Sequence, residues 1–463
     1  MRLTIEEVLR LDHVTACNIE PLRGITFAGV SIDSRTIKQN ELFFGIRGEK
    51  FDGNEFVKNG FEKGAACAVV EPQAPFDLFS DRPFVVVHDA TKALGRLANW
   101  YRRKFDIPFI AIAGSNGKTT TKEMIATVLQ TKYQVLSTQG NLNNHVGVPQ
   151  TLFRLDEKHD LAVIEIGTNH FGELKYLCEI LEPTHGLITN IGREHLEFFK
   201  DLDGVAQAEG ELFDALGSAG TGFVNRNDAY VVKLEKKMKK KIAYGFSKPN
   251  VKVRGKFIGI NEKACAAFST TAKGRKPVNI QLTVPGKHSM YNALAAATVG
   301  LTFGVPAKNI QRALGTFTAL GKRMEVIHVS GITILNDTYN ANPDSMLSAL
   351  ETLQAMKCSG KKIVILADML ELGEHSQQEH EHVGNVLNTY GIDCLLTFGT
   401  MSRHITERAK VGLKFHYDRK NILSEYAVEL VSPGDLVLVK GSRGMMMEDV
   451  VFFMQERLTR HAA

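Results

Sequence analysis

The heptapeptide Gly-Ser-Asn-Gly-Lys-Thr-Thr, at residues 114–120, has the composition of a loop that binds nucleotide phosphates. It follows an apolar stretch that predicts a strand, PFIAIA, and precedes a stretch whose apolar residues recur at helical spacing. At the start of a helix, free backbone N–H groups and the helix dipole attract phosphate, and glycines let the backbone close around it. Lys118 would reach the outer phosphates, and the Thr119 hydroxyl would ligate Mg²⁺. The predicted nucleotide-binding residues are Gly114, Ser115, Asn116, Gly117, Lys118, Thr119 and Thr120.

Phosphoryl transfer also needs metal charge, and Mg²⁺ prefers carboxylate oxygens, so an acidic residue is expected near this loop. Glu165 ends the apolar stretch LAVIEI, and His195 follows another, GLITNI. Ligands of open α/β sheets bind where parallel strands end. Both residues are therefore candidates for the site, although the pattern alone leaves open a surface role for the glutamate and a structural role for the histidine.

Short apolar runs alternating with helical stretches predict an α/β fold with mostly parallel sheets. A small α/β unit spans roughly residues 29–87, and a helix at 91–104 leads out of it. The strand–helix pattern restarts after Arg323. We therefore expect three domains, at residues 1–104, 105–318 and 319–463.

Composition limits the class of protein. The 463 residues are 44% hydrophobic and 23% charged, which is typical of a folded, water-soluble protein. A net charge of +5 over this length lacks the concentrated basic character of a nucleic-acid binder. The six cysteines stand singly, which indicates reduced and mostly buried thiols. With no apolar run long enough to span a membrane and no signal peptide, the sequence predicts a cytoplasmic protein.

Two other clusters invite a functional interpretation. The lysines of residues 236–241 could form a polyanion patch, and His375, His380 and His382 could bind a metal. We expect both to be solvated polar surfaces, which is what such clusters usually are.

Several motifs, taken with the phosphate loop, resemble the Mur ligases, the ATP-dependent amide-bond-forming enzymes of bacterial cell-wall precursor synthesis. The resemblance covers nearly the whole chain. The common phosphate loop has four residues between its glycines, and the shorter loop of this family explains why only Ser115 and Asn116 stand there. The other motifs are SIDSR (31–35), DGNEF (52–56), GNLNNHVGVPQTL (140–152), EIGTNHFGEL (165–174), TNIGREHLE (189–197), NDTYNANPDSM (336–346) and DMLELG (368–373).

Within the family, these motifs resemble the member that adds D-alanyl-D-alanine to UDP-N-acetylmuramoyl-tripeptide, and the D-N-P-R motif of a related ligase does not occur. The resemblance implies a small N-terminal α/β domain for the UDP moiety, a central P-loop ATPase domain and a C-terminal Rossmann-like domain. It implies ATP and Mg²⁺ as cofactors and an acyl-phosphate intermediate. One metal is expected at Thr119 and Glu165, and a second near His195 and Glu165. We expect a monomer.

The resemblance also assigns residues to each substrate. Those expected to hold the UDP-sugar are Ser34, Arg35, Asn141, Asn143 and Asn144. Those expected to contact adenine, ribose or phosphate are Asn292, Arg323 and Asp337. Those expected near the incoming dipeptide are Tyr339, Asn340, Asn342, Lys440 and Arg443.

One position departs from the family. In AQAEGELF, Glu209 stands where the family usually has a lysine that becomes carbamylated and organises the second metal. Our hypothesis is that this glutamate replaces the modified lysine without CO₂. The expected catalytic residues are Lys118, Glu165, His195 and Glu209. Two alternatives stay open: a Mur-type or folyl-type ligase for another amine, and a nucleotide binder without catalysis.

Overall fold

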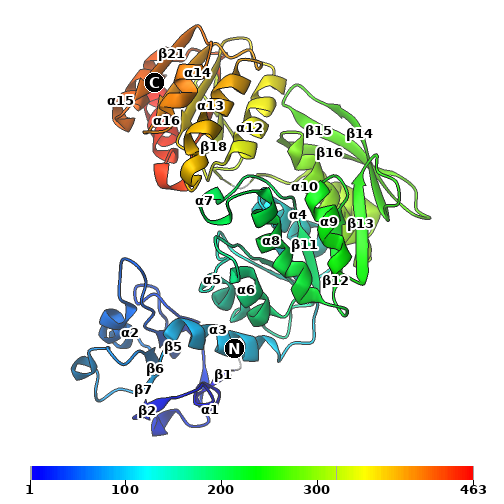
Figure 1. The fold of residues 1–463 in the computed structure, drawn as a ribbon. Helices are drawn as coiled ribbons and strands as arrows, with labels where there is room; N and C mark the ends of the chain where they lie inside the picture. Colours follow the sequence, from blue (N-terminus) through cyan, green and yellow to red (C-terminus); the bar gives the residue numbers. More distant parts are fainter. Residues whose placement is uncertain (1–2, 320, 462–463) are drawn as a thin grey trace.

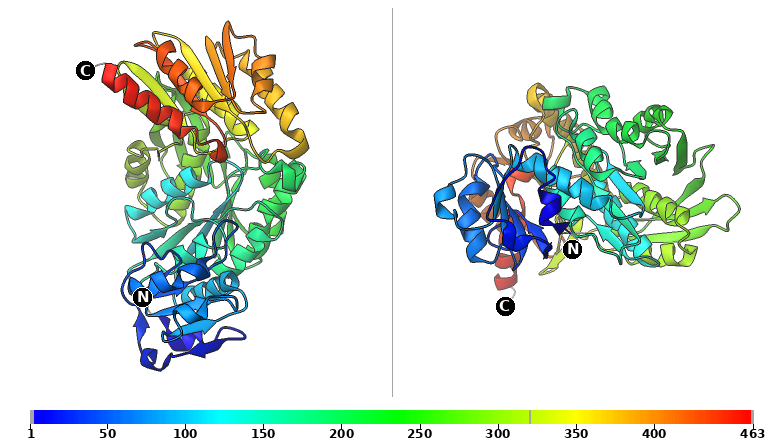
Figure 2. Two further views of the ribbon diagram at one scale, coloured as in Figure 1. Left: turned by 90° about the vertical axis from the view of Figure 1, so that its left-hand side faces the viewer. Right: turned by 90° about the horizontal axis from the view of Figure 1, so that it is seen from below.

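The computed structural model describes residues 3–319 and 321–461 as three α/β units in a row, with the N-terminal unit at one end and the C-terminal unit at the other (Figures 1 and 2). Each unit has its own main sheet. The predicted α/β class with mostly parallel sheets is confirmed. Leu320, at the expected boundary between the second and third units, lies outside the described residues.

The N-terminal unit is built on a five-stranded sheet with the order β2-β7-β6-β5-β4, in which only the β2–β7 pair is antiparallel. Its last helix, α3 (Ala90–Arg102), leads into the central unit. The elements are β1 (Leu3–Thr4), α1 (Ile5–Val8), β2 (Thr15–Cys17), β3 (Thr26–Phe27), β4 (Gly29–Ser31), β5 (Glu41–Phe44), α2 (Val57–Glu62), β6 (Cys67–Val70) and β7 (Phe84–Val86).

The central unit holds a nine-stranded sheet with the order β16-β15-β14-β13-β12-β11-β8-β10-β9. Its pairs are parallel from β9 to β14 and antiparallel from β14 to β16. The strands are β8 (Phe109–Ala113), β9 (Val135–Ser137), β10 (Leu161–Glu165), β11 (His185–Ile188), β12 (Thr221–Asn225), β13 (Lys240–Phe246), β14 (Val253–Ile260), β15 (Cys265–Ala272) and β16 (Val278–Pro285). The strands predicted from the sequence include neither β9 nor the last four, β13 to β16.

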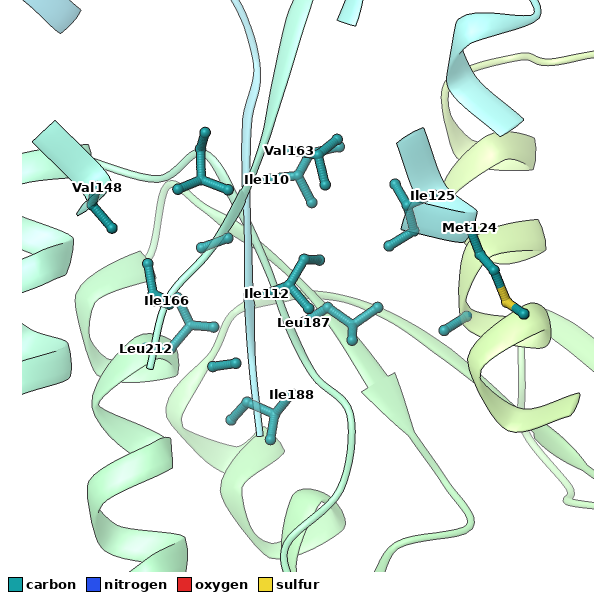
Figure 3. Packing of buried hydrophobic residues seen from close by; sticks show 14 of the residues in the cluster. Ile110, Ile112, Met124, Ile125, Val148, Val163, Ile166, Leu187, Ile188 and Leu212 are labelled. Carbon is teal, nitrogen blue, oxygen red and sulfur yellow. The ribbon is translucent and has the colours of Figure 1, made fainter. Parts of the chain in front are cut away.

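Helices cover both faces of this sheet, which is why β8 and β10 are buried along their whole length and read as continuous apolar runs. Figure 3 shows Met124 and Ile125 packing on one side of Ile110 and Ile112, and Leu212 on the other. The helices are α4 (Lys118–Gln130), α5 (Gly147–Leu152), α6 (Glu173–Leu181), α7 (Leu196–Phe199), α8 (Leu202–Leu216), α9 (Ala229–Leu234), α10 (His288–Thr302) and α11 (Ala307–Gly315).

The C-terminal unit has a six-stranded sheet with the order β17-β18-β22-β19-β20-β21, in which only β17 is antiparallel. Its strands are β17 (Glu325–Val329), β18 (Ile332–Asp337), β19 (Lys362–Ala367), β20 (Cys394–Phe398), β21 (Leu413–Tyr417) and β22 (Leu436–Lys440). Its helices are α12 (Pro343–Ala355), α13 (Ser376–Leu387), α14 (Arg403–Arg408), α15 (Lys420–Leu430) and α16 (Glu448–His461).

The minor predictions have mixed outcomes. All six cysteines are free and four of them are buried, as expected, and the lysines of residues 236–241 are exposed. The prediction of a solvated surface is wrong for His380, which is fully buried. Its Nε2 accepts a hydrogen bond from Met369 N at 3.0 Å, and its Nδ1 lies 2.7 Å from Ser376 O. One ring nitrogen thus holds the loop that follows β19, and the other contacts the first residue of the histidine's own helix, α13.

Among the described residues, no helix is long and apolar enough to cross a membrane.

Candidate active site

A cavity of about 960 Å³ lies between the central and C-terminal units. It forms where β8, β10 and β11, three adjacent parallel strands, reach their carboxyl ends and face the ends of β18 and β22. Most of the predicted site residues line it. They are Ser115, Asn116, Gly117, Lys118, Thr119, Thr120, Asn143, Asn144, Glu165, His195, Asn292, Arg323, Asp337, Tyr339, Asn340, Asn342 and Lys440.

The phosphate loop joins β8 to α4 and needs glycine at both of its predicted glycine positions. Gly114 has φ +113° and Gly117 has φ +79°, conformations that L side chains rarely adopt. A Cβ on Gly117 would also lie 2.8 Å from the Asn292 amide, so the loop packs directly against α10. Asn292 is 7% exposed. Asn292 therefore lies directly beside the phosphate loop, and its contact with the adenine stays a prediction.

The loop is also fixed to the segment after β11. Ser115 N donates to Asn190 O at 2.9 Å, and Asn116 N donates to Asn190 Oδ1 at 3.0 Å. In return, Asn190 Nδ2 donates to Asn116 O at 2.8 Å, and Gly192 N donates to Ser115 Oγ at 2.8 Å. These bonds hold the loop in a preformed shape.

Lys118 is the first residue of α4, and its Nζ donates to Gly114 O at 2.5 Å. Nζ also lies 3.5 Å from Glu194 Oε2. Burial would lower the pKa of this ammonium, but the nearby carboxylates of Glu194, Glu209 and Glu165 outweigh it and raise the pKa. The lysine is therefore held as a cation inside the site.

Glu165 ends β10 and is 2% exposed. Its Oε1 accepts a hydrogen bond from Asn143 Nδ2 at 2.8 Å, and its backbone N donates to Thr138 Oγ1 at 2.9 Å. Its Oε2 is buried without a hydrogen-bond partner. A buried carboxylate oxygen of this kind needs compensation, and a cation beside the Thr119 hydroxyl would supply it.

His195 has φ +48° at the start of α7, and its ring is oriented from the C-terminal unit. Its Nδ1 lies 2.6 Å from Glu371 Oε2, whereas its Nε2 is 3.9 Å from Glu194 Oε2. A carboxylate at one ring nitrogen is the usual way of orienting a histidine whose other nitrogen binds a metal. Contact with His195 lowers the pKa of Glu371.

In the part of the chain that the structure describes, no group of three His, Cys, Asp or Glu side chains is arranged as a complete metal site. Thr119, Glu165 and His195 are nevertheless suited to Mg²⁺, which usually keeps several waters and takes one or two carboxylates together with substrate phosphates.

Glu209 lies in α8 behind the phosphate loop and does not line the cavity. Its Oε2 accepts a hydrogen bond from Gly114 N at 2.6 Å, while its Oε1 is buried without a donor. Burial raises its pKa well above the usual range, against the opposing charge of Lys118, and Glu194 raises it further. What the geometry shows is a carboxyl group that holds the loop backbone, and the metal-binding role of Glu209 stays a prediction.

The C-terminal side of the cavity carries a second charged cluster. Lys440 Nζ lies 2.6 Å from Asp337 Oδ2 and donates to Asn340 O at 2.9 Å, so the ends of β22 and β18 are tied together. The Arg323 guanidinium lies 3.5 Å from the centre of the Tyr339 ring. This stack places a cation and an aromatic face at the mouth of the cavity.

The remaining predicted residues lie elsewhere or have local roles. Asn144 Oδ1 accepts from Gly147 N at 2.9 Å at the start of α5. Asn141 is exposed and does not line the cavity. Arg443 pairs with Glu448 at 2.7 Å, also outside the cavity lining. Ser34 and Arg35 belong to the N-terminal unit, where Arg35 pairs with Asp33 at 2.7 Å and lowers the pKa of that carboxyl to about 2.

Several residues of the site are absent from the sequence-based prediction. Glu194 is buried beside Lys118, and its only signal is its position next to His195 in a quoted motif. Arg193, Asp344 and Glu371 connect the central and C-terminal units. They come from segments far apart in the chain, and no local pattern links them.

Comparison with known families matches all three units. Residues 26–102 match the family described as "Mur ligase family, catalytic domain", residues 112–300 match "Mur ligase middle domain", and residues 322–443 match "Mur ligase, glutamate ligase domain".

Similar proteins extend over nearly the whole chain. A protein of Bacillus subtilis named UDP-N-acetylmuramoyl-tripeptide–D-alanyl-D-alanine ligase is 34% identical over 97% of this chain and 98% of its own length. An Escherichia coli protein of the same name is also 34% identical, over 94% of this chain and 95% of its own. Among solved structures, MurF from Acinetobacter baumannii aligns with a TM-score of 0.89 and 28% identity, covering 98% of this chain and 99% of its own.

Proposed function

This chain belongs to the Mur ligase family, and we propose that it is the ATP-dependent ligase that joins D-alanyl-D-alanine to UDP-N-acetylmuramoyl-tripeptide in peptidoglycan precursor synthesis. The observation that carries the proposal is the placement of a phosphate loop, with its partly buried lysine and nearby buried carboxylates, across one cavity from the charged cluster of the C-terminal unit. Relatives of this name that are similar over their full length support the choice of amine and acceptor.

The reaction must activate a carboxylate, which is a poor electrophile. A carboxylate oxygen of the tripeptide attacks the γ-phosphorus of ATP, the bond to the bridging oxygen breaks, and the products are an acyl phosphate and ADP. The amine of D-alanyl-D-alanine then attacks the acyl carbon, phosphate leaves with the bonding electrons, and the amine loses its proton. In both steps negative charge develops on phosphoryl oxygens, so preorganised cations and N–H donors are what the protein has to supply.

Lys118 and the backbone N–H groups at the start of α4 are placed to supply them. Because Lys118 is partly buried and already oriented by Gly114 O and Glu194, it needs little reorganisation when charge develops. Asn292 packs against the loop and would contact the adenine, while Arg323 and Asp337 would reach the ribose and phosphates from the C-terminal unit.

Thr119 and Glu165 would hold one Mg²⁺, and His195 with Glu165 a second. The orphaned Oε2 of Glu165 and the Glu371-oriented ring of His195 support this assignment. When bound, Mg²⁺ neutralises phosphate charge and polarises the phosphoryl group for attack. Every residue named here lines the cavity.

Each of the three units has one principal substrate in this proposal. We assign residues 1–104 to binding of the UDP moiety, 105–318 to ATP, and 319–463 to the dipeptide. Ser34, Arg35, Asn141, Asn143 and Asn144 are proposed to hold the UDP-sugar, and Tyr339, Asn340, Asn342, Lys440 and Arg443 the dipeptide side. We place the reaction in the cytoplasm, where ATP is available. We also predict that the protein is a monomer and binds no nucleic acid.

The test is phosphate release by the purified protein with ATP, Mg²⁺ and UDP-N-acetylmuramoyl-tripeptide, with and without D-alanyl-D-alanine. We expect release only with the dipeptide, a product heavier by one dipeptide less water, and loss of turnover when EDTA removes the metal. Release with another amine instead would favour a different ligase of the family. ATP binding without release for any amine would favour the nucleotide binder.

A further inference from the structure

Arg193 connects the segment after β11 to two helices of the C-terminal unit. Its Nη2 and Nε lie 2.6 and 3.1 Å from Asp344 Oδ1, and its backbone N donates to Asp344 Oδ2 at 2.7 Å. The remaining arm, Nη1, lies 2.9 Å from Glu379 Oε2. Asp344 is in the first turn of α12 and Glu379 in the first turn of α13. One side chain thus joins three separate segments of the chain.

The segment around Arg193 lies in close contact with the start of α12. A Cβ on Gly192, the residue before the arginine, would lie 2.8 Å from Asp344 Oδ2 and 3.1 Å from Asn116 Nδ2. Both carboxylate oxygens of Asp344 are used by Arg193, and the Arg193 side chain is only 24% exposed. Burial would lower the pKa of this guanidinium, but its bonds to the two carboxylates raise it.

The contact continues to the phosphate loop. Asn342 caps α12 by accepting from Ser345 N, and its Nδ2 donates to Asn116 Oδ1 at 2.9 Å. Asn116 is part of the loop that would hold the nucleotide. The position of α12 relative to this loop is therefore set by two neighbouring contacts, one to Arg193 and one to Asn116.

We propose that Arg193 is a positioning residue, which docks α12 and α13 on the central unit so that the C-terminal half of the site faces the phosphate loop. The proposal rests on the function proposed above. Arg193 does not line the cavity, so it would act through Asp344 and Glu379. Tyr339 and Asn340 lie in the loop that precedes α12. Loss of the Arg193 contacts would therefore displace these residues, which are proposed to bind the dipeptide, and would leave the phosphate loop intact.

The test compares Arg193→Ala with Arg408→Ala. Arg408, in α14, pairs at 2.7 Å with Glu381, which lies in α13 as Glu379 does. Both partners of this pair belong to the C-terminal unit. We expect Arg193→Ala to lower kcat at least roughly tenfold and to raise KM for D-alanyl-D-alanine, with the affinity for UDP-N-acetylmuramoyl-tripeptide unchanged. Small-angle X-ray scattering of the full chain should show a larger radius of gyration for this variant. Arg408→Ala should resemble the wild type in all four measurements.

Two further variants keep the test decisive if Arg193→Ala folds poorly. Arg193→Lys retains the charge but not the forked donor geometry, and Glu379→Gln weakens one arm only, so each should give an intermediate loss. A kcat and radius of gyration like those of Arg408→Ala in all three of these variants would overturn the proposal. The scattering measurement needs no turnover, so it tests whether Arg193 holds α12 and α13 on the central unit even if the wild type is inactive with the dipeptide.

Discussion

The two sides of the cavity are held together by different kinds of interaction. On the central side, the phosphate loop is fixed by hydrogen bonds to neighbouring elements of one unit, such as Asn116 N to Asn190 Oδ1 and Gly114 N to Glu209 Oε2. On the C-terminal side, α12 and the loop that follows β19 meet the central unit through side chains that cross between units, chiefly Arg193 with Asp344 and His195 with Glu371.

This difference indicates what each side does during a reaction cycle. The hydrogen bonds of the phosphate loop run to elements of its own unit and need no substrate to form, so the nucleotide side is preformed. Ion pairs between units can separate at lower cost, because both partners can return to water. The C-terminal side is thus suited to dock and release with substrates, as a site that must exclude water and later free its product requires.

The largest effect should come from the central side. Lys118→Ala removes the cation that faces Glu194, Glu209 and Glu165, and we expect phosphate release to fall by about 10²–10³-fold or more. Calorimetric affinity for UDP-N-acetylmuramoyl-tripeptide should not change. Lys118→Met, which keeps the apolar stem, and a thermal unfolding curve control for damage to the fold. Loss of UDP-substrate affinity in a folded variant would contradict the assignment of the two substrates to different units.

A smaller effect is expected from Gly114→Ala. Its φ of +113° is strained for alanine, and the new Cβ would lie 2.7 Å from Thr189 N, so the loop must shift. We expect ATP affinity, measured by titration calorimetry, to fall by roughly 10–100-fold, in line with a local strain of about 1–3 kcal/mol. Gly274→Ala is the matched control, because Gly274 has φ +78° with nothing within 4 Å of its Cβ position. An equal loss in both variants would show that the loop is not preformed.

The central side is also the part that is easiest to predict from the sequence. A glycine-rich loop between a buried strand and a helix is a local pattern. Because β8, β10 and β11 are continuous apolar runs, the sequence predicts parallel strands whose carboxyl ends meet at one edge of a sheet. Residue types and spacing are sufficient here because the residues of the site follow directly after these strands in the chain.

The contacts that join the C-terminal side to the central unit escape prediction for a physical reason. Arg193 and Asp344 are 151 residues apart, and neither ion pairs nor domain docking leave a periodic signal in the sequence. His380 is a different case, because it shares one helical face with Val383, Gly384 and Leu387, so its burial follows the period of its own helix. The hairpin strands β14–β16 are missed as well, because the strand–helix alternation that identifies parallel sheets stops before them.

Substitutions of Glu209 test how firmly the central side is held, because this residue accepts a hydrogen bond from the backbone of the phosphate loop. Glu209→Leu would leave Gly114 N buried without an acceptor, and we expect the free energy of unfolding in urea to fall by about 1–3 kcal/mol. Glu209→Gln keeps an acceptor oxygen and should retain most stability and ATP affinity. If the Gln variant loses turnover but keeps its stability, the result supports the hypothesis that the carboxylate of Glu209 binds the metal. Whatever the result for this variant, the activity of the wild type should not depend on added bicarbonate.

The smallest effect on stability is expected in the N-terminal unit, at Arg35→Ala. Arg35 is exposed, and it lowers the pKa of Asp33 to about 2, below the unfolded value near 4. A carboxyl whose pKa is lower in the folded state stabilises the fold above its unfolded pKa, and this contribution is lost as the pH falls toward 2. We therefore expect the free energy of unfolding in urea to differ slightly between the wild type and the variant. This difference should be constant from pH 7 to about 5 and become smaller below pH 4.

Because Arg35 is proposed to hold the UDP-sugar, KM for the tripeptide substrate should rise severalfold in the same variant. Arg23→Ala, which breaks another exposed pair of this unit, should leave that KM unchanged, and a matching rise there would remove Arg35 from the binding site.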